Sequence, residues 1–300
     1  MRLEFWRALL KQFLQPFLPK SMRADGVVIP VVRLSGTIMP AGNALRQTMS
    51  LASTAGMLEK AFAFKKAPAV AIAINSPGGS PVQSRLIFRR IRDLAEEKNK
   101  KVYVFVEDLA ASGGYMIAVA GDEIIADPSS IVGSIGVVSA SFGFQEMIKK
   151  IGVERRLYTA GRNKALLDPF SPEKKEDVAR LKTLQLDMHE TFIDLVKARR
   201  GGKLADNDDL FSGLFWSGKQ GLELGLVDQL GDMRSFLKAR YGDKTRMRLV
   251  SAPRGLFGRR LNLFGAGPGR GGDSEKIAGA LASGVVEALE ERALWGRFGL

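Results

Sequence analysis

The chain has 300 residues, of which 45% are hydrophobic and 26% charged, a composition typical of folded globular proteins and not of disordered ones. It contains no cysteine and one histidine, which excludes disulfides, thiol catalysis and thiolate metal sites, and we expect neither a metal nor a cofactor. Lysine and arginine outnumber aspartate and glutamate by 45 to 32, and the net charge of +13 favours contact with anionic surfaces.

The first twenty residues are predicted to form a basic amphipathic helix. Apolar residues recur there at three- and four-residue spacing, and Arg2, Arg7 and Lys11 fall between them. No apolar stretch approaches the ~18 residues that span a bilayer, and no signal-peptide core is seen. We therefore expect residues 1–20 to contact the inner membrane from its cytoplasmic face. Docking of this helix on its own protein or on a neighbouring subunit is the alternative.

The following segment alternates between short apolar strands and amphipathic helices. Strands are expected at 27–34, 69–74, 102–106 and 123–126, and helices within 44–64 and at 81–97 and 112–120. Strands that are apolar throughout and alternate with helices indicate an α/β protein with a parallel sheet covered on both faces.

The second half of the chain is predicted to be more helical. Helices are expected at 144–150 and about 172–200, with a strand near 155–158 between them. Residues 253–272 hold seven glycines, four arginines and no acidic residue, a composition typical of a flexible basic linker. A short terminal helix is expected at 277–294.

The hexapeptide AASGGY places a serine, Ser112, where a predicted strand turns into a short apolar helix. Its hydroxyl would project from the carboxyl end of the strand, beside the unpaired N–H groups of the first helical turn. The Gly113 amide can then point at an oxyanion. The pattern predicts a serine nucleophile, and a plain helix N-cap is the alternative.

A second glycine-containing loop, NSPGG at 75–79, follows the neighbouring strand. Consecutive glycines expose N–H donors and accept positive φ. Acyl transfer needs two donors that converge on one oxygen, and Gly79 and Gly113 can supply them. A plain turn is the alternative, and a phosphate cradle is disfavoured because no Gly-Lys-Ser/Thr follows.

A serine nucleophile needs a general base. His189 lies on the polar side of the long predicted helix, where a surface or core role is expected. A lysine can serve instead if desolvation lowers its pKa toward neutrality. Lys164 stands in a glycine-containing loop after a predicted strand, but spacing alone does not distinguish it from Lys149 or Lys150.

Five blocks of this sequence resemble the signal peptide peptidase A / protease IV family of membrane-associated serine proteases, in its short SohB-like form. The blocks lie between residues 27 and 232 and read INSPGG (74–79), ASGGY (111–115), VGSIGV (132–137), YTAG (158–161) leading to Lys164, and WSG (216–218) with LGLVD (224–228). Their order makes the resemblance specific.

The resemblance implies that Ser112 is the nucleophile and that Lys164, 52 residues later, is the base. Ser134 is a candidate hydrogen-bond partner of that lysine. The implied fold is of the crotonase/Clp-protease type, a parallel sheet wound with helices in repeated ββα units. The implied assembly is a ring- or dome-shaped homo-oligomer, in which Ser112 and Lys164 meet within one chain or across an interface.

On this interpretation the chain comprises an amphipathic helix (1–24), a serine peptidase domain (25–252) and a Gly/Arg-rich linker with a short C-terminal helix (253–300). The expected substrates are peptides or proteins, with cleavage in signal-peptide remnants or membrane-associated proteins. The apolar site region predicts a preference for small or apolar side chains at the scissile bond.

Two other classes of protein deserve comparison. A crotonase-like acyl-CoA enzyme would share the fold, but such enzymes usually carry an acidic residue after the second glycine block, and residues 115–118 offer none. A non-catalytic binder of nucleic acid or anionic surfaces would explain the charge, but no basic–aromatic stacking motif is present, so no specific nucleic-acid partner is expected.

The chain departs from the family in lacking a transmembrane helix and in carrying Asn163 where an aromatic often precedes the lysine.

Overall fold

The computed structural model describes residues 26–40, 48–251 and 292–299. The helix predicted at 1–24, the linker predicted at 253–272 and most of the predicted terminal helix lie outside the described residues. The elements are β1 (Val28–Ser35), α2 (Leu51–Phe62), β2 (Ala69–Ser76), α3 (Pro81–Lys98), β3 (Lys101–Ala111), α4 (Gly113–Ala118), β4 (Glu123–Ala126), β5 (Ile131–Gly133), α5 (Gln145–Lys150), α6 (Lys175–Arg200), β6 (Phe215–Ser217), α7 (Gly218–Glu223), β7 (Gln229–Leu230), α8 (Met233–Tyr241) and β8 (Arg246–Leu249).

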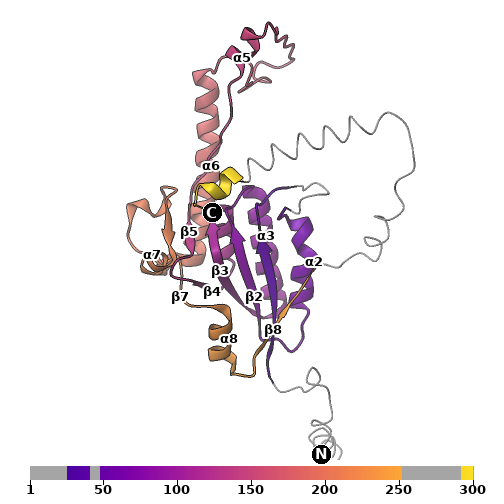
Figure 1. Cartoon of the computed structure of the whole chain (residues 1–300), viewed down its shortest axis with the longest axis vertical. Helices are drawn as coiled ribbons and strands as arrows, with labels where there is room; N and C mark the ends of the chain where they lie inside the picture. Colours follow the sequence, from indigo (N-terminus) through magenta and orange to yellow (C-terminus); the bar gives the residue numbers. More distant parts are fainter. Residues whose placement is uncertain (1–25, 41–47, 252–291, 300) are drawn as a thin grey trace, which may run out of the picture.

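Parallel pairing dominates the sheet, whose main path runs β6-β5-β3-β2-β1-β8 (Figure 1). The central strand β2 is buried along its whole length, as its continuous apolar run predicts for a strand covered on both faces. Only the pairing of β5 with β6 is antiparallel among the described strands. The predicted α/β class, with a parallel sheet wound with helices, is confirmed.

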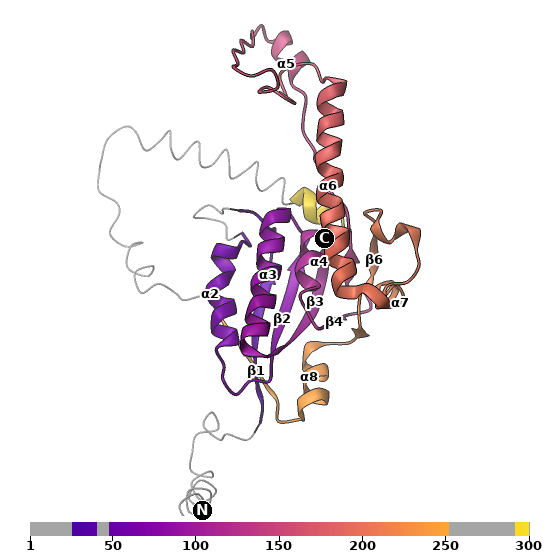
Figure 2. The same ribbon diagram turned by 180° about the vertical axis from the view of Figure 1, so that it is seen from behind.

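Helices cover the two faces of the sheet unequally. On one face α2, α3 and α4 pack over the strands and form the main apolar core with them (Figure 2). On the other face α8 packs its Phe236 edge-to-face against Tyr103 and Phe105 of β3. Apolar burial on both sides stabilises the central strands, at about 25 cal/mol for each Å² removed from water.

Strand β3 is longer than predicted because a bulge changes its partner halfway. Its first part pairs with β4 and its last part with β5, and the register against β2 shifts after Ile74. The side chain of Asn75 fits this irregularity, since its Oδ1 accepts a hydrogen bond from the Leu109 amide and its Nδ2 donates one to Asp108. The bulge redirects the end of β3 toward the turn at Ser112.

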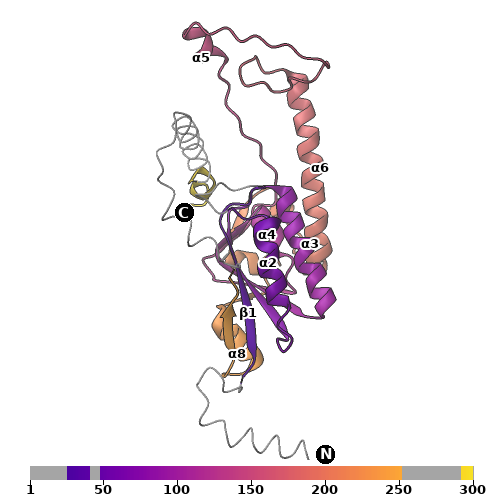
Figure 3. The ribbon, with the colours of Figure 1, turned by 90° about the vertical axis from the view of Figure 1, so that its right-hand side faces the viewer.

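An arm projects from the sheet. After β5 the chain runs out to α5 and returns through the 26-residue helix α6, whose outer part stands clear of the strands (Figure 3). We call residues 138–187 the arm. The strand predicted near 155–158 is wrong: these residues are irregular and exposed, and no neighbouring strand pairs with them in the described ranges.

The end of the chain returns to the sheet. Residues 292–296 are helical, and the buried Phe298 packs against Leu109 and Ala111 of β3. Its ring also meets Phe215 edge-to-face, with the centroids 5.0 Å apart. Across the described ranges, no helix has the length and apolar character needed to cross a membrane.

Candidate active site

Ser112 occupies a strained turn between β3 and α4. Its φ and ψ are 51° and −120°, a conformation that non-glycine residues rarely adopt and that costs about 1–3 kcal/mol. The Ser112 N–H donates to the carbonyl of Gly133 over 2.8 Å, which ties the turn to β5. The hydroxyl makes no capping hydrogen bond with α4, so the N-cap alternative does not explain this serine.

The loop at 76–79 packs directly against the serine turn. A β-carbon on Gly78 would lie 2.8 Å from the Gly113 nitrogen and 2.9 Å from the Ser112 Cβ, so only glycine permits this approach. Gly79 has φ 136°, and a β-carbon there would lie 2.1 Å from the carbonyl oxygen of Ile38. The two predicted glycine loops are therefore in contact, as the sequence analysis expected of neighbouring strand ends.

Two glycine amides belong to the pocket that contains Ser112. Neither the Gly79 N–H nor the Gly113 N–H donates a hydrogen bond to another residue in the part of the chain that the structure describes. The Gly113 amide belongs to the first turn of α4, where N–H groups lack intrahelical partners. Both glycines line one small pocket with Ser112. Two free donors beside a hydroxyl are what an oxyanion hole requires.

The rest of this pocket is apolar. Its remaining lining residues are Pro81, Met116, Gly136, Val137, Met188 and Phe192. Met188 and Phe192 come from α6, and the sequence analysis did not assign them to the site. Their only sequence signal was membership of the apolar stripe of the long helix, which is equally typical of a core face.

Ser134 lies next to the site but does not line this pocket. It is buried, has φ 53°, and donates its backbone N–H to Leu214 O over 2.8 Å. Its neighbour Gly133 holds the Ser112 amide. The strand β5 therefore places Ser134 one residue from the contact that fixes the Ser112 turn.

Lys164 lies on the arm, away from Ser112 of the same chain. It is exposed, and its backbone N–H donates to Gly161 O within its own turn. The loop that carries it is attached to the outer end of α6, because the Leu167 N–H donates to Asp177 in the first turn of that helix over 3.2 Å. From Asp177 to the pocket residue Met188 the helix rises roughly 16 Å at 1.5 Å per residue.

The imidazole of His189 is held by a backbone carbonyl. Its Nε2 lies 3.0 Å from the carbonyl oxygen of Ile135, a contact typical of a histidine that anchors a helix.

The described residues contain no group of three or more His, Cys, Asp or Glu side chains that could hold a metal.

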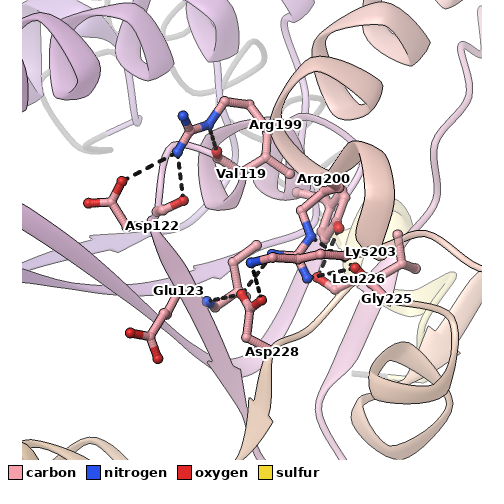
Figure 4. Close-up of polar contacts among 12 residues, drawn as sticks. Val119, Asp122, Glu123, Arg199, Arg200, Lys203, Gly225, Leu226 and Asp228 are labelled. Atoms are coloured by element: carbon pink, nitrogen blue, oxygen red, sulfur yellow. Dashed lines mark hydrogen bonds and ion pairs between the residues drawn. The ribbon is translucent and has the colours of Figure 1, made fainter.

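The base of α6 is fixed by a buried ion pair. The Arg200 guanidinium, 3% exposed, lies 2.6 Å from Asp228 and also donates to Gly225 O, and Lys203 pairs with the same carboxylate (Figure 4). Burial alone would raise the pKa of Asp228, but hydrogen bonds from Arg200 and Lys203 outweigh it and hold that pKa below its usual value. Nearby, burial raises the pKa of the Tyr115 hydroxyl, which donates to Leu226 O.

A peptidase family profile and several proteins named as proteases match this chain. The profile of peptidase family S49 matches residues 95–243. A putative protease of Synechocystis is 32% identical over 232 residues, covering 75% of this chain and 80% of the relative. Protease 4 of Haemophilus influenzae is 34% identical over 203 residues, covering 68% of this chain and 32% of the relative.

A protein of Brucella abortus named as the Na(+)/H(+) antiporter NhaA is 65% identical over 296 residues, or 97% of this chain. The chain spans only 39% of the length of that relative. The name describes the whole relative and is not carried over to this chain.

Proposed function

This chain belongs to peptidase family S49, and we propose that it is a serine endopeptidase with Ser112 as nucleophile and Lys164 as general base. One observation carries the proposal. The strained Ser112 turn presents an uncapped hydroxyl to an apolar pocket that also contains the free amides of Gly79 and Gly113.

The proposed chemistry follows from this arrangement. The neutral amine of Lys164 takes the proton of the Ser112 hydroxyl as its oxygen attacks the scissile carbonyl carbon. The carbonyl oxygen gains negative charge, which the amides of Gly79 and Gly113 stabilise. The lysine then gives the proton to the amine as the C–N bond breaks, which leaves an ester on Ser112. In the second half the lysine takes a proton from water as it attacks this ester, and gives it to the Ser112 oxygen as the ester C–O bond breaks and the acid product leaves.

We propose that the lysine comes from a neighbouring copy of the chain. Two features of the arm support this: it carries Lys164 away from Ser112 of its own chain, and it exposes many apolar side chains. The exposed apolar residues of the arm are Val138, Phe142, Met147, Ile151, Val153, Leu157, Tyr158, Leu184 and Leu186. Exposed apolar surface of this extent is typical of protein–protein contacts, so a ring- or dome-shaped homo-oligomer fits the arm.

Ser134 is proposed to hydrogen-bond the incoming lysine. The support is its position beside Gly133, whose carbonyl holds the Ser112 amide, at the end of a short buried strand. In this role Ser134 would orient the lysine amine toward the nucleophile.

The substrate class follows from the pocket lining. Met116, Val137, Met188 and Phe192 offer no charge to a bound side chain. We propose that small or apolar residues are preferred at the scissile bond, as in signal-peptide remnants or membrane-associated proteins. Each buried CH₂ contributes about 0.8 kcal/mol, whereas a buried unpaired charge is costly. A peptide-library profile dominated by charged residues at that position would contradict this specificity.

The main alternative, a crotonase-like acyl-CoA enzyme, requires a carboxylate that acts as acid or base near the oxyanion hole. The residues that line the Ser112 pocket include no aspartate or glutamate. The pocket therefore favours a peptidase.

The direct test is an activity probe. Wild-type protein treated with a fluorophosphonate should gain one adduct at Ser112, measured by intact-mass and peptide-mapping spectrometry. Ser112→Ala should lose both the adduct and peptide cleavage, and Lys164→Ala should lose cleavage while it stays folded. Undiminished cleavage by Ser112→Ala, or an adduct on another serine, would refute the assignment.

Residues 1–20 are proposed to bind the inner membrane surface, through apolar residues and a local excess of basic charge. The full chain should co-sediment with anionic liposomes, and the binding should weaken with salt. A chain that starts at Ala24 should not bind. Equal binding by both would show that the segment serves packing or assembly instead.

A further inference from the structure

The helix that follows the proposed nucleophile has one polar side chain of its own, Tyr115, whose hydroxyl donates to Leu226 O. Helix α4 has the sequence GGYMIA, and all six residues are buried. Its carboxyl end exposes the carbonyls of Val119, Ala120 and Gly121 to the protein interior, where unpaired carbonyls are costly. These three carbonyls therefore need donors from elsewhere in the fold.

Two arginines from different helices supply those donors. Arg199 of α6 donates its Nε to Val119 O and its Nη2 to Gly121 O, each over 2.9 Å (Figure 4). Arg92 of α3 donates its Nη1 to Ala120 O over 3.1 Å. The end of α4 opposite Ser112 is thus held by both helices that flank it.

Asp122 completes this cluster. Its carboxylate accepts a hydrogen bond from Arg92 over 3.1 Å and lies 3.7 Å from Arg199, so one acid lies between two guanidinium groups. The same carboxylate accepts the Val102 N–H over 2.9 Å, which ties the cluster to the start of β3. The strand that ends at Ser112 and the helix that starts there are therefore fixed by one set of contacts. We call Arg92, Arg199 and Asp122 the arginine clamp.

We propose that Arg92 and Arg199 are positioning residues for the reaction, because they set where α4 lies along its own axis. The inference rests on the proposed function of Ser112. Six residues of α-helix rise about 9 Å, so a shift at the clamped end is transmitted to the Gly113 amide. Oxyanion donors must stay within roughly 0.5 Å of their productive position.

The amino end of α4 is tightly packed, so α4 cannot shift along its axis without changing its contacts there. A β-carbon on Gly113 would lie 2.3 Å from the Ser84 Oγ, and one on Gly114 would lie 2.5 Å from the Ser76 carbonyl oxygen. Movement of α4 therefore changes the spacing between the Gly113 amide and the loop that carries Gly79.

Arg199 also links the nucleophile helix to the pocket wall and the arm. It lies seven residues after Phe192 on α6, the helix that contributes Met188 and Phe192 to the Ser112 pocket. Because α6 continues outward to the arm, Arg199 ties the serine-bearing helix to the inner part of the helix whose outer part carries this chain's arm.

The test compares variants of the full chain. Arg199→Met removes the donors and keeps much of the apolar stem, and Arg199→Lys keeps the charge with fewer donors. Arg89→Met is the matched control, since Arg89 is an exposed arginine of α3, the helix that carries Arg92, and lies outside the arm. We would measure the rate of fluorophosphonate labelling at Ser112, kcat and KM for an apolar peptide, and Tm. Rates are compared below the Tm of each variant, where it is folded.

The expected result is a selective loss of rate. Arg199→Met should lower the labelling rate and kcat by about 10- to 100-fold while KM changes far less, as for misplacement by about 1 Å. Arg199→Lys should fall between Arg199→Met and wild type, and Arg89→Met should match wild type.

A lower Tm with unchanged labelling and kcat in Arg199→Met would overturn the inference and leave a structural role only. If Arg199→Met does not fold, Arg199→Lys decides, and wild-type kcat and labelling in that variant would overturn it. Failure of the wild type to label at Ser112 would instead overturn the proposed function, and the inference with it.

Discussion

Four glycines determine the geometry around Ser112, because a β-carbon on any of them would overlap a neighbouring atom. They are Gly78, Gly79, Gly113 and Gly114. The overlaps involve backbone atoms in three cases, so the chain cannot accommodate them by moving a flexible side chain. At Gly113 the closest atom is instead a side-chain oxygen, Ser84 Oγ, at 2.3 Å. This difference makes Gly113 the position where a compensating substitution can be designed.

We predict that Gly113→Ala destabilises the fold by about 1–3 kcal/mol, the usual cost of overpacking, and that Ser84→Ala partly restores it. Removal of the Ser84 hydroxyl leaves contacts of 3.3 Å, to the Ser84 Cβ and the Ile38 Cδ1. Urea denaturation of both single variants and the double variant gives the coupling energy. The control is Gly143→Ala, where a β-carbon meets nothing within 4 Å. Additive effects in the double variant would contradict this packing account.

At the scale of elements, α6 matters most, because it carries both the pocket wall and the arm. Its inner end is fixed by the pair between Arg200 and Asp228. The folded protein lowers the pKa of Asp228, so this carboxylate contributes stability that is present above its ordinary pKa of about 3.9. That contribution is lost as the pH falls through the lower pKa of the folded state.

We predict that Asp228→Asn lowers the free energy of unfolding at pH 7 by about 3–5 kcal/mol, because Arg200 is left buried without its counter-charge. Below pH 4 the difference from wild type should shrink, since the wild-type carboxylate is then being protonated. Urea denaturation from pH 7 to pH 2 measures both effects. Asp243→Asn, at an exposed aspartate, should follow the wild-type curve. A pH-independent difference would contradict the role of the Asp228 charge.

A second element-scale prediction concerns the end of the chain. Phe298 packs against Leu109 and Ala111, the latter directly before Ser112. Truncation of a buried phenylalanine costs up to about 3–5 kcal/mol, so Phe298→Ala should lower Tm while Arg292→Ala, at an exposed position, should not. Differential scanning calorimetry measures the change. An unaltered Tm in Phe298→Ala would show that this contact contributes nothing to stability.

At the scale of the whole molecule, the sequence was sufficient to predict the features that depend on local patterns of residues. The apolar runs of β1 to β4 and the periodicity of α3 and α6 were sufficient for the α/β class, and the glycines beside Ser112 predicted its turn. The strand near 155–158 was predicted wrongly because a strand needs a partner, which its own residues do not reveal.

The contacts that join distant parts of the chain had no sequence signal. Arg199 meets Val119 across 80 positions, and Phe298 meets Ala111 across a still longer separation. No periodicity or motif encodes which arginine caps which helix, or which end of a chain returns to which strand. For the same reason, the pairing of Ser112 with Lys164 followed only from a resemblance and remains a prediction.

The central claim, that one chain supplies Ser112 and its neighbour supplies Lys164, is tested most directly by complementation. Ser112→Ala and Lys164→Ala, each inactive alone, are co-expressed and purified as mixed oligomers, and cleavage of an apolar peptide is measured. Random assembly around a head-to-tail ring should give about one quarter of the wild-type activity, because about one interface in four pairs an intact serine with an intact lysine. Mixed oligomers as inactive as the single variants would contradict the claim.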